Sequence, residues 1–479
     1  MDMYNEKSLK NEEVDSKSNI AHLYSRLRDI IEWSDKVTKY IEDNGYTRAS
    51  LSYRFYKPHW IRDASFTALS LIEAASLIKD DKFLNGLNIS DKLKKDLKEK
   101  SSNYDKYASK IIDFNLEVFE NFKENIKKFL NSSFESLPYN VVNYNIPARV
   151  GSDAKLYKDD LMDDNNYANS FSGLVQNDSV PLIMISLEYK ADNIGLNEKE
   201  ISFLKENSNM IFNFLTKSIR VQSANAWEIR SDMQHSYDIA SIYRAMVSLN
   251  RISNKYNIGF DSSKVNILLD SDRFSNPLTY LKKLSINSNI LYACRMPFSD
   301  KPNIDLGVDM SELIVFTLFG INDDVLETEN VETKTIEEIE NNLFNGKLMS
   351  KRFKYDSYFF GGRWIISAAE KGIYLIKKGK LDEAENMLKK LTKGYYEGWD
   401  KADEKAVNIT GEYKINSFPE QIIYDPESPN SEDNNYFKNN GNSVIQDLMW
   451  SYADVVRFAS MLIKEELNNK EISKEIRKG

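Results

Sequence analysis

Helical segments of two kinds alternate along this chain, and that alternation limits the folds open to it more than any other feature. Segments such as 63–78 and 178–190 are apolar on nearly every side, as helices inside a protein are. Segments such as 105–130 carry apolar residues on one face at the helical period, as surface helices do. An inner layer of helices sheathed by an outer layer produces this pattern.

The pattern predicts roughly a dozen helices. They are expected at 22–44, 63–78, 105–130, 178–190, 201–219, 237–253, 311–319, 336–344, 364–378, 381–391 and 444–467. Segment 381–391 resembles a tetratricopeptide helix, but no repeat of about 34 residues supports a solenoid. With 18 glycines and 10 prolines, the 479 residues also argue against an all-β protein. We expect an all-α fold in one domain, 19–468, between polar tails at 1–18 and 469–479.

Composition excludes several classes of function. The net charge of −9 argues against nucleic acid as a partner, because phosphate binding needs a basic surface. No apolar run of about 18 residues exists, so no membrane partner is expected. One cysteine and three scattered histidines predict no disulfide, no metal site and no cofactor. Without a signal-like N-terminus the default is a cytoplasmic monomer, and a processed secreted form remains an alternative.

Long polar loops, rich in aromatic residues, precede the helices that are apolar all round. Loops of this kind usually carry function, and loops that all precede inner helices gather at one end of a barrel. They span 47–62, 138–176, 356–363 and 411–442. Aromatic residues make up 12% of the chain, which suits a protein that stacks rings against sugars or bases.

Two of these loops are followed by an acid at the entrance of an apolar helix. In the first, Tyr56 and Trp60 precede Arg62 and Asp63. Asp63 fits a capping role with Arg62 as its ion partner, and the pair equally fits a site that holds vicinal hydroxyls above Trp60. The sequence Gln176-Asn177-Asp178 repeats the arrangement, with the same two interpretations for Asp178.

A third loop combines Arg352, Asp356 and Tyr358 with Trp364 and two glycines. This composition is typical of the wall of a sugar-binding cleft. An aromatic loop packed on its own barrel would have the same composition.

Two glutamates on separate loops complete the candidate site. Glu228 follows Trp227 ahead of the helix at 237–253, and Glu420 lies in the loop at 411–442. Alone, a glutamate such as Glu228 is more often structural than catalytic. Hydrolysis of a glycosidic bond, however, needs one protonated and one ionised carboxyl. The chain has no Ser/His/Asp spacing, nucleophile elbow, P-loop or Gly-x-Gly-x-x-Gly motif that would indicate other chemistry.

Taken in order, these motifs resemble glycoside hydrolase family 15, the glucoamylases. The matching motifs run from about residue 45 to 460, and no single one is decisive. They are Tyr56 to Asp63, Gln176-Asn177-Asp178, Trp227-Glu228, Arg352 with the stretch Asp356 to Trp364, Glu420-Gln421, and Asp447 to Ala453 around Trp450.

The resemblance implies an (α/α)6 barrel with about six inner and six outer helices, whose catalytic domain acts on an oligosaccharide or glucan. It implies an inverting exo-α-glucosidase that releases β-glucose, with Glu228 as general acid and Glu420 as general base. Tyr56, Trp60, Arg62 and Asp63 would line the terminal-sugar subsite. The other substrate-binding residues would be Gln176, Asp178, Trp227, Arg352, Asp356, Tyr358, Trp364 and Trp450. The activity should follow a bell-shaped, acid-side pH profile, with Glu228 protonated and Glu420 ionised.

The chain departs from the family around the acid and the leaving-group side. Ile229 replaces the second glutamate of Trp-Glu-Glu, Asn225 replaces an aspartate of fungal members, and Ser172 replaces a tryptophan; Ser179 replaces a glycine. These changes keep two further activities open, hydrolysis of α,α-trehalose and of α-1,6 glucans. A non-catalytic helical toroid that binds carbohydrate or a partner protein is the alternative of another class.

Overall fold

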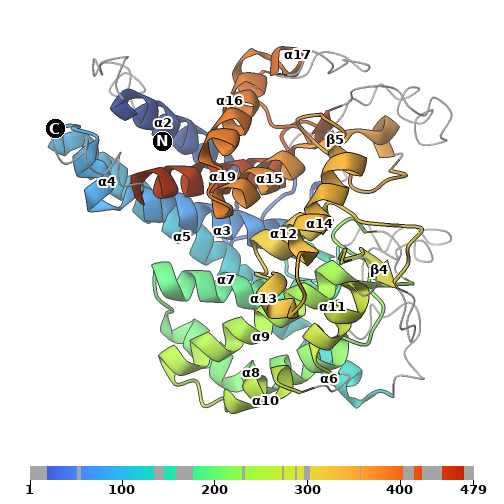
Figure 1. Cartoon of the computed structure of the whole chain (residues 1–479). Coiled ribbons are helices and arrows are strands. Elements are labelled where there is room, and N and C mark those ends of the chain that lie inside the picture. The colour runs from blue at the N-terminus through green and yellow to red at the C-terminus, as the bar shows by residue number, and fades with distance from the viewer. Residues whose placement is uncertain are drawn as a thin grey trace.

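The computed structural model describes most of the chain, and in the described residues helices dominate (Figure 1). The described ranges are 19–50, 56–133, 145–157, 176–228, 232–271, 275–285, 289–295, 302–356, 358–402, 415–422 and 445–468. The expectations for the two tails, for Ser172 and for Ile229 therefore lie outside the described residues. None of the described helices is long and apolar enough to cross a membrane.

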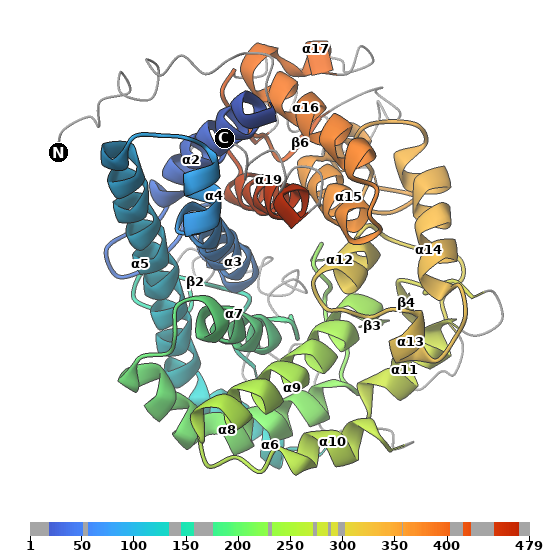
Figure 2. The same ribbon diagram turned by 60° about the vertical axis from the view of Figure 1, so that its left-hand side comes forward.

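Six of the described helices form a closed inner ring, in which each helix contacts the next and the last contacts the first (Figure 2). In ring order they are α3 (Ile61–Ile78), α7 (Ser179–Asn193), α9 (Ser236–Tyr256), α12 (Ser311–Thr317), α15 (Ile365–Lys377) and α19 (Met449–Asn468). The segments that are apolar all round lie in this ring, since α3 and α7 are buried on nearly every side. The hydrophobic effect thus places them where both neighbours and the outer layer cover them.

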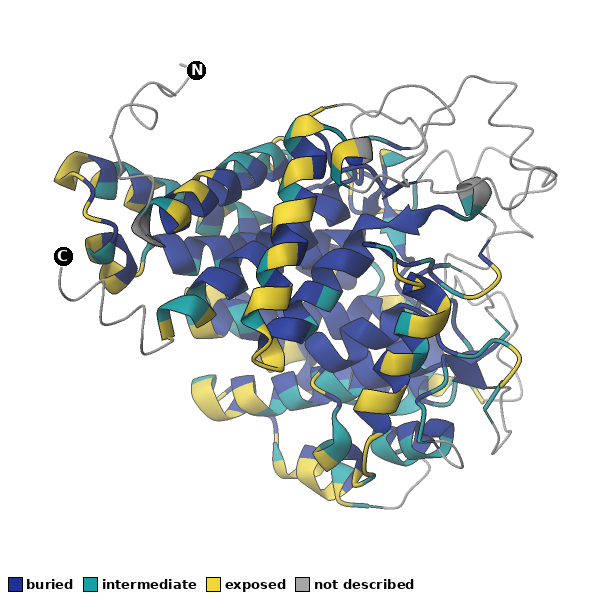
Figure 3. Ribbon diagram, turned by 45° about the horizontal axis from the view of Figure 1, so that its top comes forward, coloured by how far each residue is buried: buried dark blue, intermediate teal, exposed yellow. Residues whose placement is uncertain are grey.

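An outer helix precedes each inner helix in the sequence. The outer helices are α2 (Asn19–Thr38), α5 (Asp91–Asn121), α8 (Glu198–Ser218), α11 (Pro277–Ser285), α14 (Val331–Ile339) and α16 (Leu381–Glu397). They bury one face against the ring and expose the other, which Figure 3 shows as dark blue and yellow sides of one ribbon. The expected (α/α)6 barrel is thereby confirmed for the described part of the chain.

Several helix boundaries differ from the expected ones. The segment 105–130 is two helices, because α5 ends before Phe122 and α6 (Lys123–Asn131) starts after it. The segment 336–344 divides between α14 and a π-helical turn at Glu340–Phe344. Short elements complete the layers: α4 (Asp81–Gly86), α10 (Ser263–Leu269), α13 (Asp323–Leu326), α17 (Trp399–Ala402) and a 3-10 turn at Tyr358–Gly361.

Within the described ranges, three two-residue antiparallel ladders fix the loops at the entrances of alternate inner helices. They pair β1 (His59–Trp60) with β2 (Arg149–Val150), β3 (Gln234–His235) with β4 (Cys294–Arg295), and β5 (Arg363–Trp364) with β6 (Gln421–Ile422). The strands β1, β3 and β5 run directly into α3, α9 and α15. Each ladder therefore holds a loop from later in the chain at the N-terminal end of an inner helix.

Candidate active site

The candidate site residues lie at the N-terminal ends of the inner helices. Arg62 and Asp63 lie in the first turn of α3, Asp178 immediately precedes α7, and Trp450 lies in the first turn of α19. Glu420 directly precedes β6, whose partner β5 leads into α15. Segments that are far apart in the sequence are thus brought to one end of the ring.

Glu228 is held by the loop at the start of α3. Its Oε1 accepts a hydrogen bond of 2.7 Å from the indole nitrogen of Trp60. Nη2 of Arg62 lies 3.8 Å from the same oxygen. The Glu228 side chain is 35% exposed, so solvent and ligands reach it. Its backbone has φ +59°, a left-handed conformation that is uncommon for residues other than glycine.

Arg62 joins the first two loops. Its Nε donates to Asp63 Oδ1 at 3.2 Å, and its Nη1 donates to Gln176 Oε1 at 3.0 Å. The guanidinium lies 4.9 Å from the ring centroid of Trp450. Planar guanidinium groups prefer such stacked and hydrogen-bonded surroundings. The expected ion pair of Arg62 with Asp63 is present, and Gln176 belongs to the same network.

Asp63 and Asp178 do not cap their helices. Trp60 occupies the N-cap position of α3, and Asp178 occupies that of α7, yet neither helix has a side-chain capping hydrogen bond. The capping interpretation is therefore wrong for both acids. Burial raises the pKa of each carboxyl to about 6, and the neighbouring Arg62 lowers it in part. Two buried acids without a capping role, beside one arginine, suit a polar binding site better than a helix terminus.

Glu420 accepts a hydrogen bond of 2.7 Å at Oε1 from the Tyr56 hydroxyl. The Tyr56 hydroxyl also lies 3.3 Å from that of Tyr358. Glu420 is only 3% exposed, and burial raises its pKa to about 7. The Tyr56 hydrogen bond and the charge of Arg352 oppose that increase without cancelling it.

The loop of Arg352 forms a compact cation-aromatic cluster. Arg352 makes two parallel hydrogen bonds to Asp356, from Nε at 2.9 Å and from Nη2 at 2.8 Å. Its guanidinium lies 4.9 Å from the ring of Tyr358 and 4.8 Å from that of Trp364. Tyr358 is half-buried, so part of this cluster faces outward.

Three tryptophans pack against one another instead of offering open faces. The Trp227 ring lies 5.6 Å from Trp364 and 5.9 Å from Trp450, measured between ring centroids. All three are buried. Most of the ring surface of Trp227, Trp364 and Trp450 is thus packed against the protein itself, as expected of an aromatic loop packed on its own barrel.

A continuous chain of contacts links the two candidate catalytic carboxyls. Glu228 is bonded to Trp60, the rings of Trp60 and Tyr56 lie 5.6 Å apart, and Tyr56 is bonded to Glu420. Two glutamates separated by nearly two hundred positions in the sequence thus border the same pair of aromatic side chains.

Sequence reasoning missed two neighbours of this network. Asp309, which precedes α12, accepts hydrogen bonds from the side chains of Asn225 and Trp227. Arg149 lies across the β1–β2 ladder with its guanidinium 5.4 Å from the ring of Trp60. An acid just ahead of an apolar helix, the pattern of Asp63 and Asp178, also occurs at Asp309 and could have drawn attention to it. Among the described residues no group of three or more His, Cys, Asp and Glu side chains is arranged to hold a metal ion.

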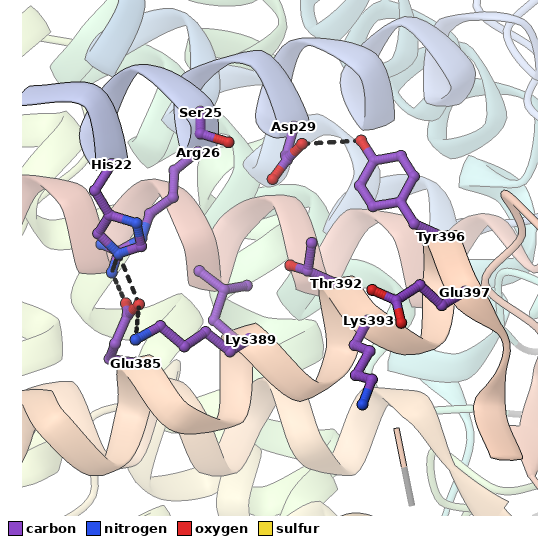
Figure 4. Close-up of a pocket in the computed structure, with 11 residues that line it drawn as sticks. His22, Ser25, Arg26, Asp29, Glu385, Lys389, Thr392, Lys393, Tyr396 and Glu397 are labelled. Carbon is purple, nitrogen blue, oxygen red and sulfur yellow. Dashed lines mark hydrogen bonds and ion pairs between the residues drawn. The ribbon is translucent and has the colours of Figure 1, made fainter. Parts of the chain in front are cut away.

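A separate cavity of about 260 Å³ lies between α2 and α16 (Figure 4). His22 and Glu385 interact across it at 2.8 Å, and the Tyr396 hydroxyl donates to Asp29 at 2.9 Å. None of the candidate site residues lines this cavity. It belongs to the outer layer of the barrel.

Solved structures of similar fold are glycosidases and glucoamylases. A wild-type glycosidase is 16% identical, with a TM-score of 0.66 over 94% of this chain and 99% of that chain. A variant glycosidase in complex with glucose gives 16% identity and a TM-score of 0.67 over the same shares. The glucoamylase from Saccharomycopsis fibuligera is 12% identical, with a TM-score of 0.52 over 97% of this chain and 99% of that chain. The family 15 glucoamylase from Hypocrea jecorina is 13% identical, with a TM-score of 0.53 over 93% and 72%. The expected resemblance to family 15 is thereby confirmed at the level of the fold.

One family model, the KAP family P-loop domain, matches residues 77–225. A P-loop needs a strand, a Gly-x-x-x-x-Gly-Lys-Ser/Thr loop and a helix. None of the glycines in this range is followed by lysine; they are Gly86, Gly151, Gly173 and Gly195. The described residues of the range form the helices of the barrel, from the end of α3 to α8, with one two-residue strand. The match therefore identifies no phosphate-binding loop. No curated protein matches the sequence.

Proposed function

We propose that this protein is an inverting, exo-acting α-glucosidase that releases β-glucose from the non-reducing ends of α-glucans or maltooligosaccharides. The observation that carries the proposal is the contact chain from Glu228 through Trp60 and Tyr56 to Glu420. Hydrolysis with inversion needs two carboxyls on either side of one sugar ring, with room for a water molecule between. The neighbours named glycosidase and glucoamylase support the same reaction class.

Glu228 is the general acid of the proposed reaction. Trp60 donates to Oε1, and Arg62 faces that same oxygen, so Oε2 is the oxygen left to carry the proton. Glu228 transfers this proton to the glycosidic oxygen as the bond to the anomeric carbon breaks. Its exposed position lets a leaving sugar depart into solvent.

Glu420 is the general base on the opposite side of the sugar ring. Tyr56 orients the carboxylate by donating to Oε1, and Oε2 takes a proton from water as the water oxygen bonds to the anomeric carbon. Arg62 and Asp63, buried together at the start of α3, hold the hydroxyls of the terminal sugar. Arg352, oriented by Asp356, supplies positive charge near Glu420. Because these groups bind the terminal sugar of a chain, the enzyme would remove sugars one at a time from the chain end.

Glutamine substitution at each catalytic position tests the assignment. E228Q and E420Q keep the side-chain shape and the bonds from Trp60 and Tyr56, but they remove the proton donor and the base. Each should lower kcat on maltotriose by about 10³-fold, since positioned acids and bases contribute about 10² to 10⁴. E383Q, on the exposed face of α16, is the matched control and should leave kcat unchanged. Values within a few-fold of wild type for E228Q and E420Q would show that the roles are misassigned.

Analysis of the released sugar by NMR tests the stereochemistry. β-Glucose as the first product supports inversion, and α-glucose as the first product contradicts it. A panel of maltose, maltotriose, isomaltose and trehalose separates the α-1,4 activity from the α-1,6 and trehalose activities. Tight binding of maltooligosaccharides without any turnover would support the non-catalytic toroid instead.

A further inference from the structure

The loop that carries Glu228 is tied to a buried carboxylate that the reaction does not use. Asp309 lies just ahead of α12 and is only 3% exposed. Its Oδ2 accepts from the Asn225 amide nitrogen at 3.1 Å, and its Oδ1 accepts from the Trp227 indole nitrogen at 3.3 Å. Burial raises the pKa of this carboxyl, while the hydrogen bonds from Ser311 and Trp227 lower it in part. One carboxylate thus holds two side chains of the loop directly before Glu228.

Asn225 in turn accepts hydrogen bonds from the backbone of Trp227 and Glu228. Its side-chain oxygen accepts from the Trp227 backbone N–H at 3.0 Å, and its carbonyl oxygen accepts from the Glu228 N–H at 2.9 Å. Glu228 itself has the left-handed φ of +59°. A residue other than glycine keeps that conformation only where its surroundings enforce it. The contacts of Asn225 with Asp309 provide such enforcement.

We propose that Asp309 is a positioning residue, which fixes the carboxyl of Glu228 against Trp60 by holding Asn225 and Trp227. The proposal rests on the proposed function, in which Glu228 is the general acid. It also explains why the chain has an amide at Asn225. A carboxylate at that position would face the carboxylate of Asp309 at about hydrogen-bond distance, and like charges so close disfavour ionisation of both.

Asp309 also has a second, local role, and a test must distinguish it from the positioning of Glu228. Its Oδ1 accepts from the Ser311 backbone N–H at 2.6 Å and from the Ser311 hydroxyl, which forms a turn at the start of α12. Asparagine forms the same turn with its side-chain oxygen. D309N therefore preserves the turn but presents an amide donor to the amide donor of Asn225. If Asp309 served only to form this turn, D309N would leave kcat and KM unchanged.

Exchanging the two groups restores the contact. In N225D/D309N, the amide at position 309 donates to the carboxylate at position 225, and its oxygen still accepts from Ser311 and Trp227. The second oxygen of the new carboxylate still accepts from the Trp227 backbone. The double variant thus retains every contact, with donor and acceptor reversed only between positions 225 and 309, whereas N225D and D309N each lose the contact between these two positions.

The experiment measures kcat and KM on maltotriose for the wild type, N225D, D309N and the double variant. Each single variant should lower kcat about 100-fold, because a small misplacement of a reacting group costs about that much. KM should stay within about two-fold, and the double variant should recover to within about ten-fold of wild-type kcat. D261N is the matched control, because Asp261 makes the same turn with Ser263, at 3.1 Å to its N–H, away from Glu228. Its kcat should equal that of the wild type.

Crystal structures of the same four proteins provide a readout that is independent of activity. The 2.7 Å contact between Trp60 and Glu228 should be lost in each single variant and return in the double variant. Persistence of that contact in D309N, or additive losses of kcat in the double variant, would overturn the proposal. If the wild type hydrolyses no glycoside, the proposed function fails, while the structures still decide whether Asp309 positions Glu228. If D309N fails to fold, N225D and the double variant carry the comparison.

Discussion

Burial gives Glu420, the proposed general base, an unusual titration for that role. Its pKa rises from 4.5 to about 7, chiefly because a buried carboxylate loses its hydration. The base works only when ionised, so kcat/KM should fall tenfold per pH unit well below pH 7. The sequence-based expectation of an acid-side profile took no account of this burial. With Glu420 as the base, the ascending limb of the profile should lie near neutral pH.

Removing the Tyr56 hydroxyl should shift that limb further. The hydroxyl stabilises the charged form of Glu420, so Y56F should raise the pKa of Glu420 and move the limb upward by about one pH unit. The profile of kcat/KM on maltotriose measures the shift. Y396F removes a similar hydrogen bond, from Tyr396 to Asp29 in the outer layer, and should leave the profile unchanged. An unmoved limb in Y56F would mean that another group titrates.

At the residue scale, sequence motifs predicted the charged groups of the candidate site but not the residues that hold them in place. Arg62 with Asp63, and the pair Glu228 and Glu420, were found from local patterns that recur at helix entrances. The role of Asp309 was not, because its bond to Asn225 spans 84 positions and leaves no local pattern. The capping assignment of Asp63 failed because Trp60 begins the helix.

At the scale of elements, close approach between inner helices depends on small side chains. A Cβ at Gly372 of α15 would lie 2.3 Å from the ring of Phe458 on α19. Phe458 is buried, so its ring cannot swing out into solvent. The contact between α15 and α19 is therefore set by a glycine.

G372A should destabilise the barrel despite the better helix propensity of alanine. Alanine gains about 1 kcal/mol in an open helix, but overpacking a core costs about 1–3 kcal/mol. The net loss of up to about 2 kcal/mol should lower the midpoint of urea unfolding. E383A, on the exposed side of α16, should change stability by less than about 0.5 kcal/mol. A rise in stability for G372A would show that the two helices can separate at little cost.

The sequence predicted the long elements better than the short ones. Helices α3 and α7 were expected within two or three residues of their ends, because a fully apolar helix has a strong signal over many positions. The outer helix α11 and the short α10, α13 and α17 were not expected, since so few turns show no clear period. The apolar periodicity of segment 105–130 continues through Phe122, so it did not predict that α5 ends there.

For the whole molecule, the two ends of the described chain meet where α2, the first described helix, contacts α16 and α19. Arg26 of α2 forms ion pairs with Glu385 of α16 and with Glu466 of α19, the latter at 2.5 Å. Figure 4 shows the α2–α16 side of this junction. The three side chains are largely buried, so their charges interact more strongly than surface charges do.

R26A should destabilise the whole barrel without touching the candidate site. Glu466 would lose its contact with Arg26, and Glu385 would keep only those with His22 and Lys389. We expect a cost of about 2–3 kcal/mol, since these groups keep some solvent contact. R28A changes an exposed arginine on the same helix and is the matched control. Urea unfolding should show one transition shifted to lower urea for R26A, with kcat on maltotriose unchanged below it. A lower kcat with unchanged stability would contradict this separation of the junction from the site.

The two-layer arrangement followed from the alternation of helices, but the ring of six did not. Periodicity reports which face of a helix is buried and says nothing of how many helices share a ring. The number came from the resemblance and is confirmed by the contacts of the described helices. Linkage preference and oligomeric state are set by side chains and surfaces that no period encodes, so they stay predictions.

The closure of the ring has a consequence for the order in which the protein is made. The backbone of Ala49, before α3, accepts from the Met449 N–H at 2.9 Å, and Glu420 donates its own N–H to Ile445 at 2.8 Å. Both partners leave the ribosome among the last residues of the domain. Until then α3 lacks one neighbour, its apolar side stays open, and Glu420 has no fixed place. The candidate site of a nascent chain thus stays incomplete until residues 445 to 449 have left the ribosome.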